Sequence, residues 1–490
     1  MKLKSVHVRM YRNILESGEV TIEPDATCLV GKNESGKTAF LQALWRLNPA
    51  RTKPTFSVPD HYPAWLEKRH RNEGKDLDEV YPVNALYAWE DADKLAVEKV
   101  FGKGVAPKTD LSISKSYENE FRWSHGCDEK AAVQNVLKSQ KRPKLVTEAL
   151  KNSATFDSLR RAIVAAKTKH AEAPEVLAAL GELEAQLKEL LADKSFSGAL
   201  WQLILPRVPK FLYFADYSRL PYAVKIGHIL KADDSKLSES EATARALLRL
   251  GGAEQEYLLN PDYERRKREL ENVANALTDD VLKYWTQNAE LRVQPEITQR
   301  NEAVANGQQT VLDELKIRIW DNRHSLSLPF DQHSSGFQWF FSFLAAFSEF
   351  EHQTPPVVIL LDEPAVALHA KAQADFLRFI DERLTKRCQV IYTTHSPFMV
   401  QPGHLERVRM VEDKGKEEGS TISSDVLSRD PDTLFPLQGA LGYDLVQHLF
   451  VAKHNLVVEG TSDYAYLRII SDHLQKGGRK HLDPRWSIVP

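Results

Sequence analysis

Apolar and polar residues alternate like a strand near the start of the chain, and a helical pattern follows. Val6 and Val8 alternate with polar residues, Val20 and Ile22 do so again, and residues 27–30 form a short apolar run that ends at Gly31. From residue 37 to about 47 the apolar side chains recur at the spacing of one helical face. Because strands repeat every second residue and helices every 3.6, the pattern predicts short strands, a tight loop and a helix.

The middle of the chain, from 128 to 290, has mostly helical periodicity. Leucines at helical spacing occupy residues 177–190, and a charged helical stretch lies within 238–290. A short aromatic strand at 211–214 interrupts this segment. We therefore expect a mostly helical insertion broken by one strand of the main domain. Its leucine stripes need a partner surface, either the main domain itself or a second chain, and they predict at least a dimer.

Strands and helices alternate again after residue 290. Strands are expected at 291–297, 315–320, 357–361 and 389–393, with helices at about 336–350 and 371–385. This alternation predicts an α/β fold with a largely parallel sheet. A further strand at 455–458 and a helix at about 463–474 begin another unit.

Four segments follow from these patterns, and we expect them to correspond to domains. They are the first part of the α/β domain at 1–127, the mostly helical insertion at 128–290, the second part of the α/β domain at 291–452, and an incomplete unit at 453–490.

Composition narrows the class of protein. The 490 residues exceed what one core normally holds, and a formal net charge of −3 means that any DNA contact must come from a local patch. No apolar run is long enough to span a membrane, and the first residues lack the pattern of a signal peptide. The three cysteines are widely separated. A cytoplasmic protein without a membrane contact is expected.

A phosphate-binding pattern follows the strand at 27–30. It consists of Gly31, Lys32, Asn33, Glu34, Ser35, Gly36, Lys37 and Thr38. Backbone N–H groups of such a loop, at a helix N-terminus, point at the phosphates of ATP. Lys37 is expected to reach the β- and γ-phosphates, and the Thr38 hydroxyl to bind Mg²⁺. The alternative is a chance Gly-Lys-Thr sequence after a strand.

Two acids end the apolar strand at 357–361. Asp362 is expected to hold Mg²⁺ through water, and Glu363 to orient or deprotonate the attacking water. His395 ends the next strand, where it can hydrogen-bond a γ-phosphate. A solvated acidic turn and a structural surface histidine are the alternatives.

In this order, Gly31–Thr38, Leu361–Pro364 and His395-Ser396 resemble the ABC-type ATPase heads of the RecF, SMC and OLD group. The resemblance implies a homodimer in which Ser335 and Gly336, at a helix start, cap the ATP of the partner. The leading leucine of that signature is His333 here, and a serine helix cap is the alternative.

Arg12 and Asn13 lie after the first strand, where this group often carries a pair near the nucleotide. An exposed basic loop is an equally good interpretation of this pair.

Residues 454–463 resemble the opening of a Toprim domain, a strand followed by Glu459-Gly460 and by Asp463 at a helix start. The resemblance implies that Glu459 binds Mg²⁺ together with a later Asp-x-Asp pair. No such pair follows Glu459 before Pro490, so we expect that this stretch alone cannot complete the metal site. An ordinary strand–turn–helix is the alternative.

An ATPase head followed by the start of a Toprim domain is the layout of OLD-family endonucleases. The resemblance implies ATP hydrolysis coupled to DNA cleavage, a role in phage defence and a protein partner. The competing function is an ATP-driven DNA clamp or sensor without nuclease chemistry, like RecF or SMC heads. A transporter ATPase is disfavoured by the long insertion. An Asp-x-Asp on a strand beyond Pro490 would decide for the nuclease.

Overall fold

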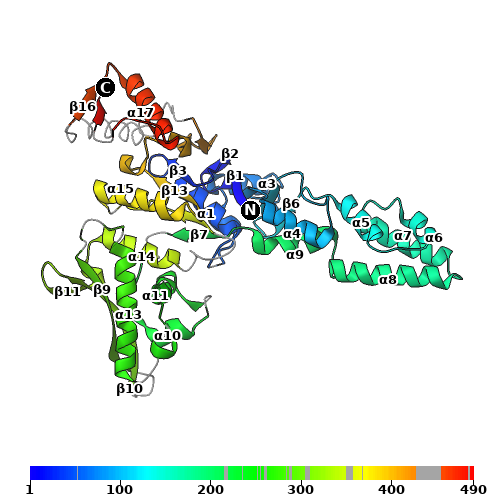
Figure 1. The fold of residues 1–490 in the computed structure, drawn as a ribbon, viewed down its shortest axis with the longest axis horizontal. Coiled ribbons are helices and arrows are strands. Elements are labelled where there is room, and N and C mark those ends of the chain that lie inside the picture. The colour runs from blue at the N-terminus through cyan, green and yellow to red at the C-terminus, as the bar shows by residue number, and fades with distance from the viewer. Residues whose placement is uncertain are drawn as a thin grey trace.

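The computed structural model shows a head from which two groups of helices extend (Figure 1). It describes residues 1–51, 53–214, 219–233, 236–250, 252–253, 255–258, 262–282, 284–285, 288, 290–303, 309–348, 357–366, 368–425, 454–483 and 486–489.

A six-stranded sheet forms the centre of the head, in the order β15-β14-β3-β13-β12-β7. Its strands are β3 (Ala26–Val30), β7 (Phe211–Phe214), β12 (Val358–Leu361), β13 (Gln389–Thr394), β14 (Val408–Asp413) and β15 (Ser420–Ser423). All pairs are parallel except β14–β15. Every residue of β3, β7, β12 and β13 is buried, which fits their apolar sequences because parallel strands are covered on both faces.

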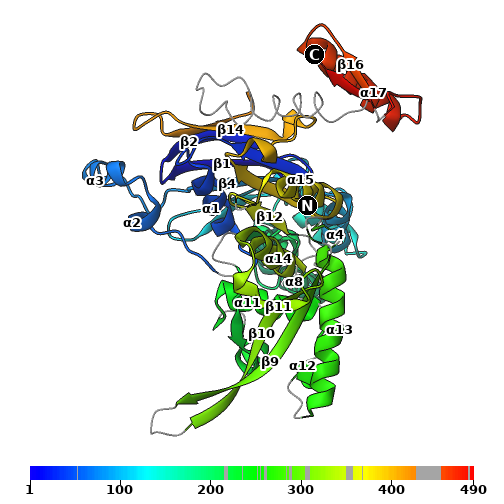
Figure 2. The same ribbon diagram turned by 90° about the vertical axis from the view of Figure 1, so that its left-hand side faces the viewer.

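A five-stranded antiparallel sheet lies beside the central sheet, in the order β2-β1-β4-β5-β6. Its strands are β1 (Lys2–Tyr11), β2 (Ile14–Thr21), β4 (Val83–Ala88), β5 (Leu111–Lys115) and β6 (Phe121–Ser124). Helix α1 (Lys37–Leu47) lies against both sheets (Figure 2). Its apolar side chains share a hydrophobic cluster with β1 and β4. The helices α2 (Val58–His61), α3 (Ala64–Asn72) and α4 (Asp91–Phe101) complete this region. The predicted α/β class is confirmed by these two sheets and their helices.

The first helical group precedes β7. It consists of α5 (Glu129–Lys138), α6 (Lys144–Leu150), α7 (Phe156–Lys169), α8 (Pro174–Leu191) and α9 (Phe196–Ile204). The buried stripe of α8, Leu180, Leu183 and Leu187, packs within this group, where α8 contacts α6, α7 and α9. The expected partner surface of this stripe is therefore found within the chain itself, and the stripe gives no argument for a dimer.

The second helical group follows β7 and packs in a different hydrophobic cluster. It consists of α10 (Ile226–Lys231), α11 (Glu239–Leu250), α12 (Gln255–Leu258), α13 (Tyr263–Leu282) and α14 (Ser335–Ser348). A smaller antiparallel sheet supports it, with β8 (Ala223–Lys225), β9 (Leu291–Ala303), β10 (Gln309–Asp321) and β11 (Leu326–Pro329). The segment expected at 128–290 thus contains the first helical group and helices α10 to α13 of the second, with β7 between them.

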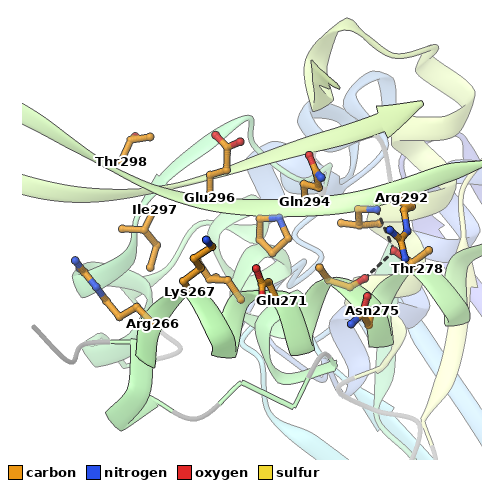
Figure 3. A pocket seen from close by; sticks show the side chains of 14 residues that line it. Arg266, Lys267, Glu271, Asn275, Thr278, Arg292, Gln294, Glu296, Ile297 and Thr298 are labelled. Atoms are coloured by element: carbon orange, nitrogen blue, oxygen red, sulfur yellow. Dashed lines mark hydrogen bonds between the residues drawn. The ribbon is translucent and has the colours of Figure 1, made fainter. Parts of the chain in front are cut away.

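The predicted strands at 291–297 and 315–320 belong to this smaller sheet and not to the parallel one. They form the long hairpin β9–β10, in which Leu291 pairs with Asp321 and Leu315 with Ile297. A parallel pair needs a crossover of a dozen or more residues, and an antiparallel hairpin does not. A cavity of about 670 Å³ lies between α13 and β9 (Figure 3), and it shares no residue with the site described below.

The remaining elements follow β12. Helix α15 (Ala370–Phe379) continues into one π-helical turn (Ile380–Leu384), and short 3-10 turns occupy Leu205–Arg207, Phe330–Gln332, Pro397–Met399 and Leu405–Arg407. A β-α-β unit ends the described chain, with β16 (His454–Val457), α17 (Thr461–Lys476) and β17 (Trp486–Val489), and β16 pairs with β17 in parallel. Of the helices that the structure describes, none has the length and apolarity needed to cross a membrane.

Candidate functional site

The loop at 31–38 joins β3 to α1, and its lysine is turned back onto the loop. Lys37 is buried, and its Nζ lies 2.8 Å from the carbonyl oxygens of both Gly31 and Lys32. Gly36 has φ +106°, and a Cβ there would lie 2.8 Å from Ser420 Oγ. Glycine is therefore required at Gly36 both by backbone conformation and by space. The loop is therefore fixed by the hydrogen bonds of Lys37 to its carbonyl oxygens and by the close contact of Gly36 with Ser420 of β15.

Asp362 accepts hydrogen bonds from three hydroxyl groups. Thr38 Oγ1 and Thr393 Oγ1 lie 2.9 Å and 3.0 Å from Asp362 Oδ1, and the Tyr213 hydroxyl lies 2.8 Å from Oδ2. Tyr213 is itself fixed, because its ring stacks on Trp45 of α1 at a centroid distance of 5.1 Å. The orientation of the Asp362 carboxylate is thus set by neighbours on three different elements.

Glu363 lies between a lysine and a histidine. Its Oε1 is 3.2 Å from Lys37 Nζ, and its Oε2 is 2.7 Å from His395 Nδ1. Its backbone N–H donates to Thr393 Oγ1 at 2.7 Å, and its φ of +47° is unusual for a residue with a side chain. Because β3, β13 and β12 are adjacent and parallel, the loop, the two acids and His395 all lie at their carboxyl ends.

A cavity of about 360 Å³ opens above this arrangement. It is lined by Arg12, Asn13, Asn33, Glu34, Ser35, Gly36, Lys37, Thr38, Ala39 and Glu363. Asn13 Nδ2 donates to the Glu34 carbonyl oxygen at 3.1 Å, so the turn after β1 is tied to the loop. Arg12 is exposed on the same rim, with its guanidinium 5.8 Å from the centre of the Tyr11 ring.

Cys28 lies within β3 directly before the loop, and it is fully buried. Burial raises the pKa of this thiol to about 12. The thiol therefore remains neutral at ordinary pH and is not a nucleophile.

Ser335 and Gly336 are placed away from this cavity. They begin α14, where Ser335 is exposed and Gly336 is buried, and neither lines the cavity. The Phe337 N–H donates to Ser334 Oγ at 3.3 Å. His333 is half-buried, its Nε2 has no hydrogen-bond partner among the residues that the structure describes, and burial lowers its pKa.

Glu459 and Asp463 lie in the β-α-β unit and are not brought to the cavity either. Glu459 is exposed in the turn after β16, and Asp463 is exposed in the first turn of α17. Within the part of the chain that the structure describes, no three histidine, cysteine or acidic side chains are grouped as a metal site.

Two residues of the site were not expected from the sequence. Thr393 stands two positions before His395, and Tyr213 is the one polar residue in the aromatic strand Phe211–Phe214. Tyr213 reaches Asp362 because β7 pairs with β12, with Tyr213 opposite Leu360. The hydroxyl in an otherwise apolar buried strand was the signal that could have identified it, since a buried hydroxyl needs a partner.

Two curated proteins are similar to part of this chain. The chain is 29% identical over 171 residues to an uncharacterized protein of Methanocaldococcus jannaschii, covering 34% of this chain and 40% of that protein. It is 31% identical over 156 residues to a protein of Thermus scotoductus named OLD nuclease, covering 30% of this chain and 29% of that protein. The chain therefore spans less than half the length of these two curated relatives.

Solved structures that resemble the chain include heads of SMC proteins. One is an SMC head bound to the C-terminal winged-helix domain of ScpA, with 10% identity, a TM-score of 0.40 and coverage of 86% of this chain and 97% of that one. Another is the SMC head domain of Thermotoga maritima, with 12% identity, a TM-score of 0.33 and coverage of 86% and 98%.

A family model extends over both halves of the site. The model described as AAA ATPase domain matches residues 1–400, which include the loop at 31–38, Asp362, Glu363 and His395. Since this match covers most of the sequence, the chain belongs to the AAA ATPase domain family.

Proposed function

We propose that this AAA-family protein binds ATP with Mg²⁺ in the cavity above the P-loop and hydrolyses it there. The observation that carries the proposal is the convergence of Lys37, Thr38, Asp362 and Glu363, at the carboxyl ends of adjacent parallel strands. The residues fit Mg²⁺, because a hydroxyl and a carboxylate oxygen lie 2.9 Å apart and oxygen is the ligand that Mg²⁺ prefers. Bound Mg²⁺ would neutralise charge on the β- and γ-phosphates.

Lys37 and Glu363 exchange partners in this proposal. The ammonium group of Lys37 now lies against two carbonyl oxygens and the Glu363 carboxylate. Phosphate oxygens compete for the same ammonium group, and they carry more charge than a carbonyl. ATP binding would thus release Glu363, which would then orient or deprotonate the attacking water. In this proposal His395, which is hydrogen-bonded to Glu363 Oε2, would sense the γ-phosphate.

The cavity is incomplete without a second head in this proposal. Ser335 is exposed at the start of a 14-residue helix outside the cavity of its own chain. Backbone N–H groups at a helix N-terminus bind phosphate. We propose that Ser335 and Gly336 cap the ATP of the partner in a homodimer, with Arg12 and Asn13 at the rim.

ATP hydrolysis is coupled, in the same proposal, to Mg²⁺-dependent DNA cleavage by a Toprim unit. The support is the partial relative named OLD nuclease and the β-α-β unit in which Glu459 follows β16 and Asp463 begins α17. Several carboxylates must converge to hold a divalent ion beside a phosphate. Glu459 and Asp463 would provide the first part of such a cluster.

The coupling is tested by comparing DNA cleavage with ATP hydrolysis in the full-length protein. We expect its Glu459→Ala variant to lose cleavage of plasmid DNA in Mg²⁺, while ATP hydrolysis, measured as phosphate release, stays at the wild-type rate. Glu175→Gln, which changes an exposed acid on α8, serves as the control and should affect neither activity. Continued cutting by Glu459→Ala would remove the Toprim interpretation and favour a DNA clamp or sensor.

Tyr213 gives a more specific test of the metal site. Tyr213→Phe keeps the ring that stacks on Trp45 but removes one of the three hydroxyl donors to Asp362. Partners that orient metal-binding groups typically change metal affinity by about 10- to 100-fold when they are removed. We therefore expect the Mg²⁺ concentration for half-maximal ATPase activity to rise about 10-fold, with ATP binding in EDTA unchanged.

The matched control is Tyr87→Phe. Within the described part of the chain the Tyr87 hydroxyl is buried on β4 without a hydrogen-bond partner, so its removal should leave the Mg²⁺ dependence as in the wild type. An unchanged Mg²⁺ dependence in Tyr213→Phe would contradict the role given to this tyrosine.

A further inference from the structure

The outer face of the antiparallel sheet carries a hollow that the ATPase proposal does not use. The hollow measures about 350 Å³ and lies over β1, β4, β5 and β6. Asn84, Ser112 and Ser114 line it, and Arg9 and Arg122 line it from β1 and β6. The apolar side chains of β1 and β4 point the other way, into the cluster shared with α1.

Two arginines supply hydrogen-bond donors to this hollow. The Nε of Arg9 donates to the Tyr81 carbonyl oxygen at 3.2 Å, and the guanidinium of Arg122 lies 6.0 Å from the centre of the Tyr81 ring. Neither arginine has a carboxylate within ion-pair distance among the residues described. Glu16 is the residue opposite Arg9 in the β1–β2 ladder, but its carboxylate is bonded to His7.

The serines add a further donor. Asn84 Nδ2 donates to Ser112 Oγ at 3.1 Å and to Ser114 Oγ at 2.9 Å. The Ser112 hydroxyl donates back to Asn84 Oδ1 at 3.3 Å. Ser114 is buried, and its own hydroxyl hydrogen has no acceptor in the part of the chain that is described. The asparagine thus orients two hydroxyl groups in the floor, and one of them still has a proton to donate.

We propose that this hollow binds a phosphoryl group, carried either by a nucleic-acid strand or by a free phosphate compound. A phosphate has several acceptor oxygens, and the cavity offers two guanidinium groups and one hydroxyl group as donors. The carboxylate of Glu16, opposite Arg9, is already bonded to His7. Arginine is suited to this task because its planar donors bind two phosphate oxygens at once. A volume of about 350 Å³ exceeds what a phosphate ion alone would fill, so the attached sugar also has room.

The test measures binding directly and does not depend on ATPase or nuclease activity. Arg9 and Arg122 are exposed, so Arg9→Gln and Arg122→Gln should fold normally, alone and together. Binding of a fluorescein-labelled single-stranded oligonucleotide is followed by anisotropy at several salt concentrations, and binding of inorganic phosphate by calorimetry. Arg161→Gln, an exposed arginine on α7, is the matched control.

For a nucleic-acid strand, we expect the double variant to bind the oligonucleotide about 10- to 100-fold more weakly. The slope of log affinity against log salt should also become shallower, by about 0.7 for each phosphate that an arginine no longer neutralises. For a free phosphate compound, the calorimetric signal of phosphate should be lost in the double variant with oligonucleotide binding unchanged. Equal binding of both probes by wild type and double variant would overturn the proposal.

Discussion

Replacing Lys37 by alanine is expected to weaken ATP binding about 100-fold or more. A bond between charged groups contributes about 1.5–3 kcal/mol, and Lys37 is expected to contact both the β- and γ-phosphates. The substitution also removes the donor that holds the carbonyl oxygens of Gly31 and Lys32 in place. Equilibrium binding of a fluorescent ATP analogue measures this effect.

Lys68→Ala is the control for the lost charge, because Lys68 is an exposed lysine on α3 outside the cavity. It should bind the analogue as the wild type does. Circular dichroism of the Lys37→Ala protein would show whether the fold is kept. Wild-type affinity in a folded Lys37→Ala protein would mean that the nucleotide binds elsewhere.

Replacing Glu363 by glutamine is expected to slow ATP hydrolysis about 10²- to 10⁴-fold while leaving ATP binding intact. Glutamine can keep the hydrogen bond to His395, but its amide cannot accept a proton from water. The variant should therefore hold ATP and accumulate as a closed dimer, which light scattering would detect. Single-turnover phosphate release measures the chemical step.

The Glu175→Gln protein again provides the comparison, and it should turn over at the wild-type rate. Turnover of Glu363→Gln at that same rate would exclude Glu363 as the base. A protein that remained a monomer in ATP would reject the role given to Ser335 and Gly336 in a partner.

Elements with a strong local pattern were predicted closely. The helix after the P-loop was expected at 37–47 and spans Lys37–Leu47, and the aromatic strand was expected at 211–214 and spans Phe211–Phe214. The acids at 362–363 and His395 lie together because each follows a buried parallel strand, which the apolar runs at 357–361 and 389–393 indicate. In these places the local sequence contains the information that the fold uses.

Elements that depend on distant partners were not predicted. Strands β14 and β15 gave no clear pattern, because Arg409 interrupts the apolar residues of β14. That arginine is buried in the structure, where it donates to the Glu23 carboxylate and to the Thr21 carbonyl oxygen, both remote in sequence. The pairing of β7 with β12 likewise joins residues that are remote in sequence, so Tyr213 could not be placed beside Asp362 in advance.

The position of β7 has a thermodynamic consequence. This strand follows the first helical group and precedes the second, and its Tyr213 hydrogen-bonds to the carboxylate proposed to hold the metal water. Coupling between two binding events is reciprocal, whichever event comes first. Suppose that binding of metal and nucleotide shifts β7 and thereby changes the affinity of a partner protein for either helical group. Binding of that partner must then change the affinity for metal and nucleotide by the same factor. Such a partner could regulate the ATPase without touching the cavity.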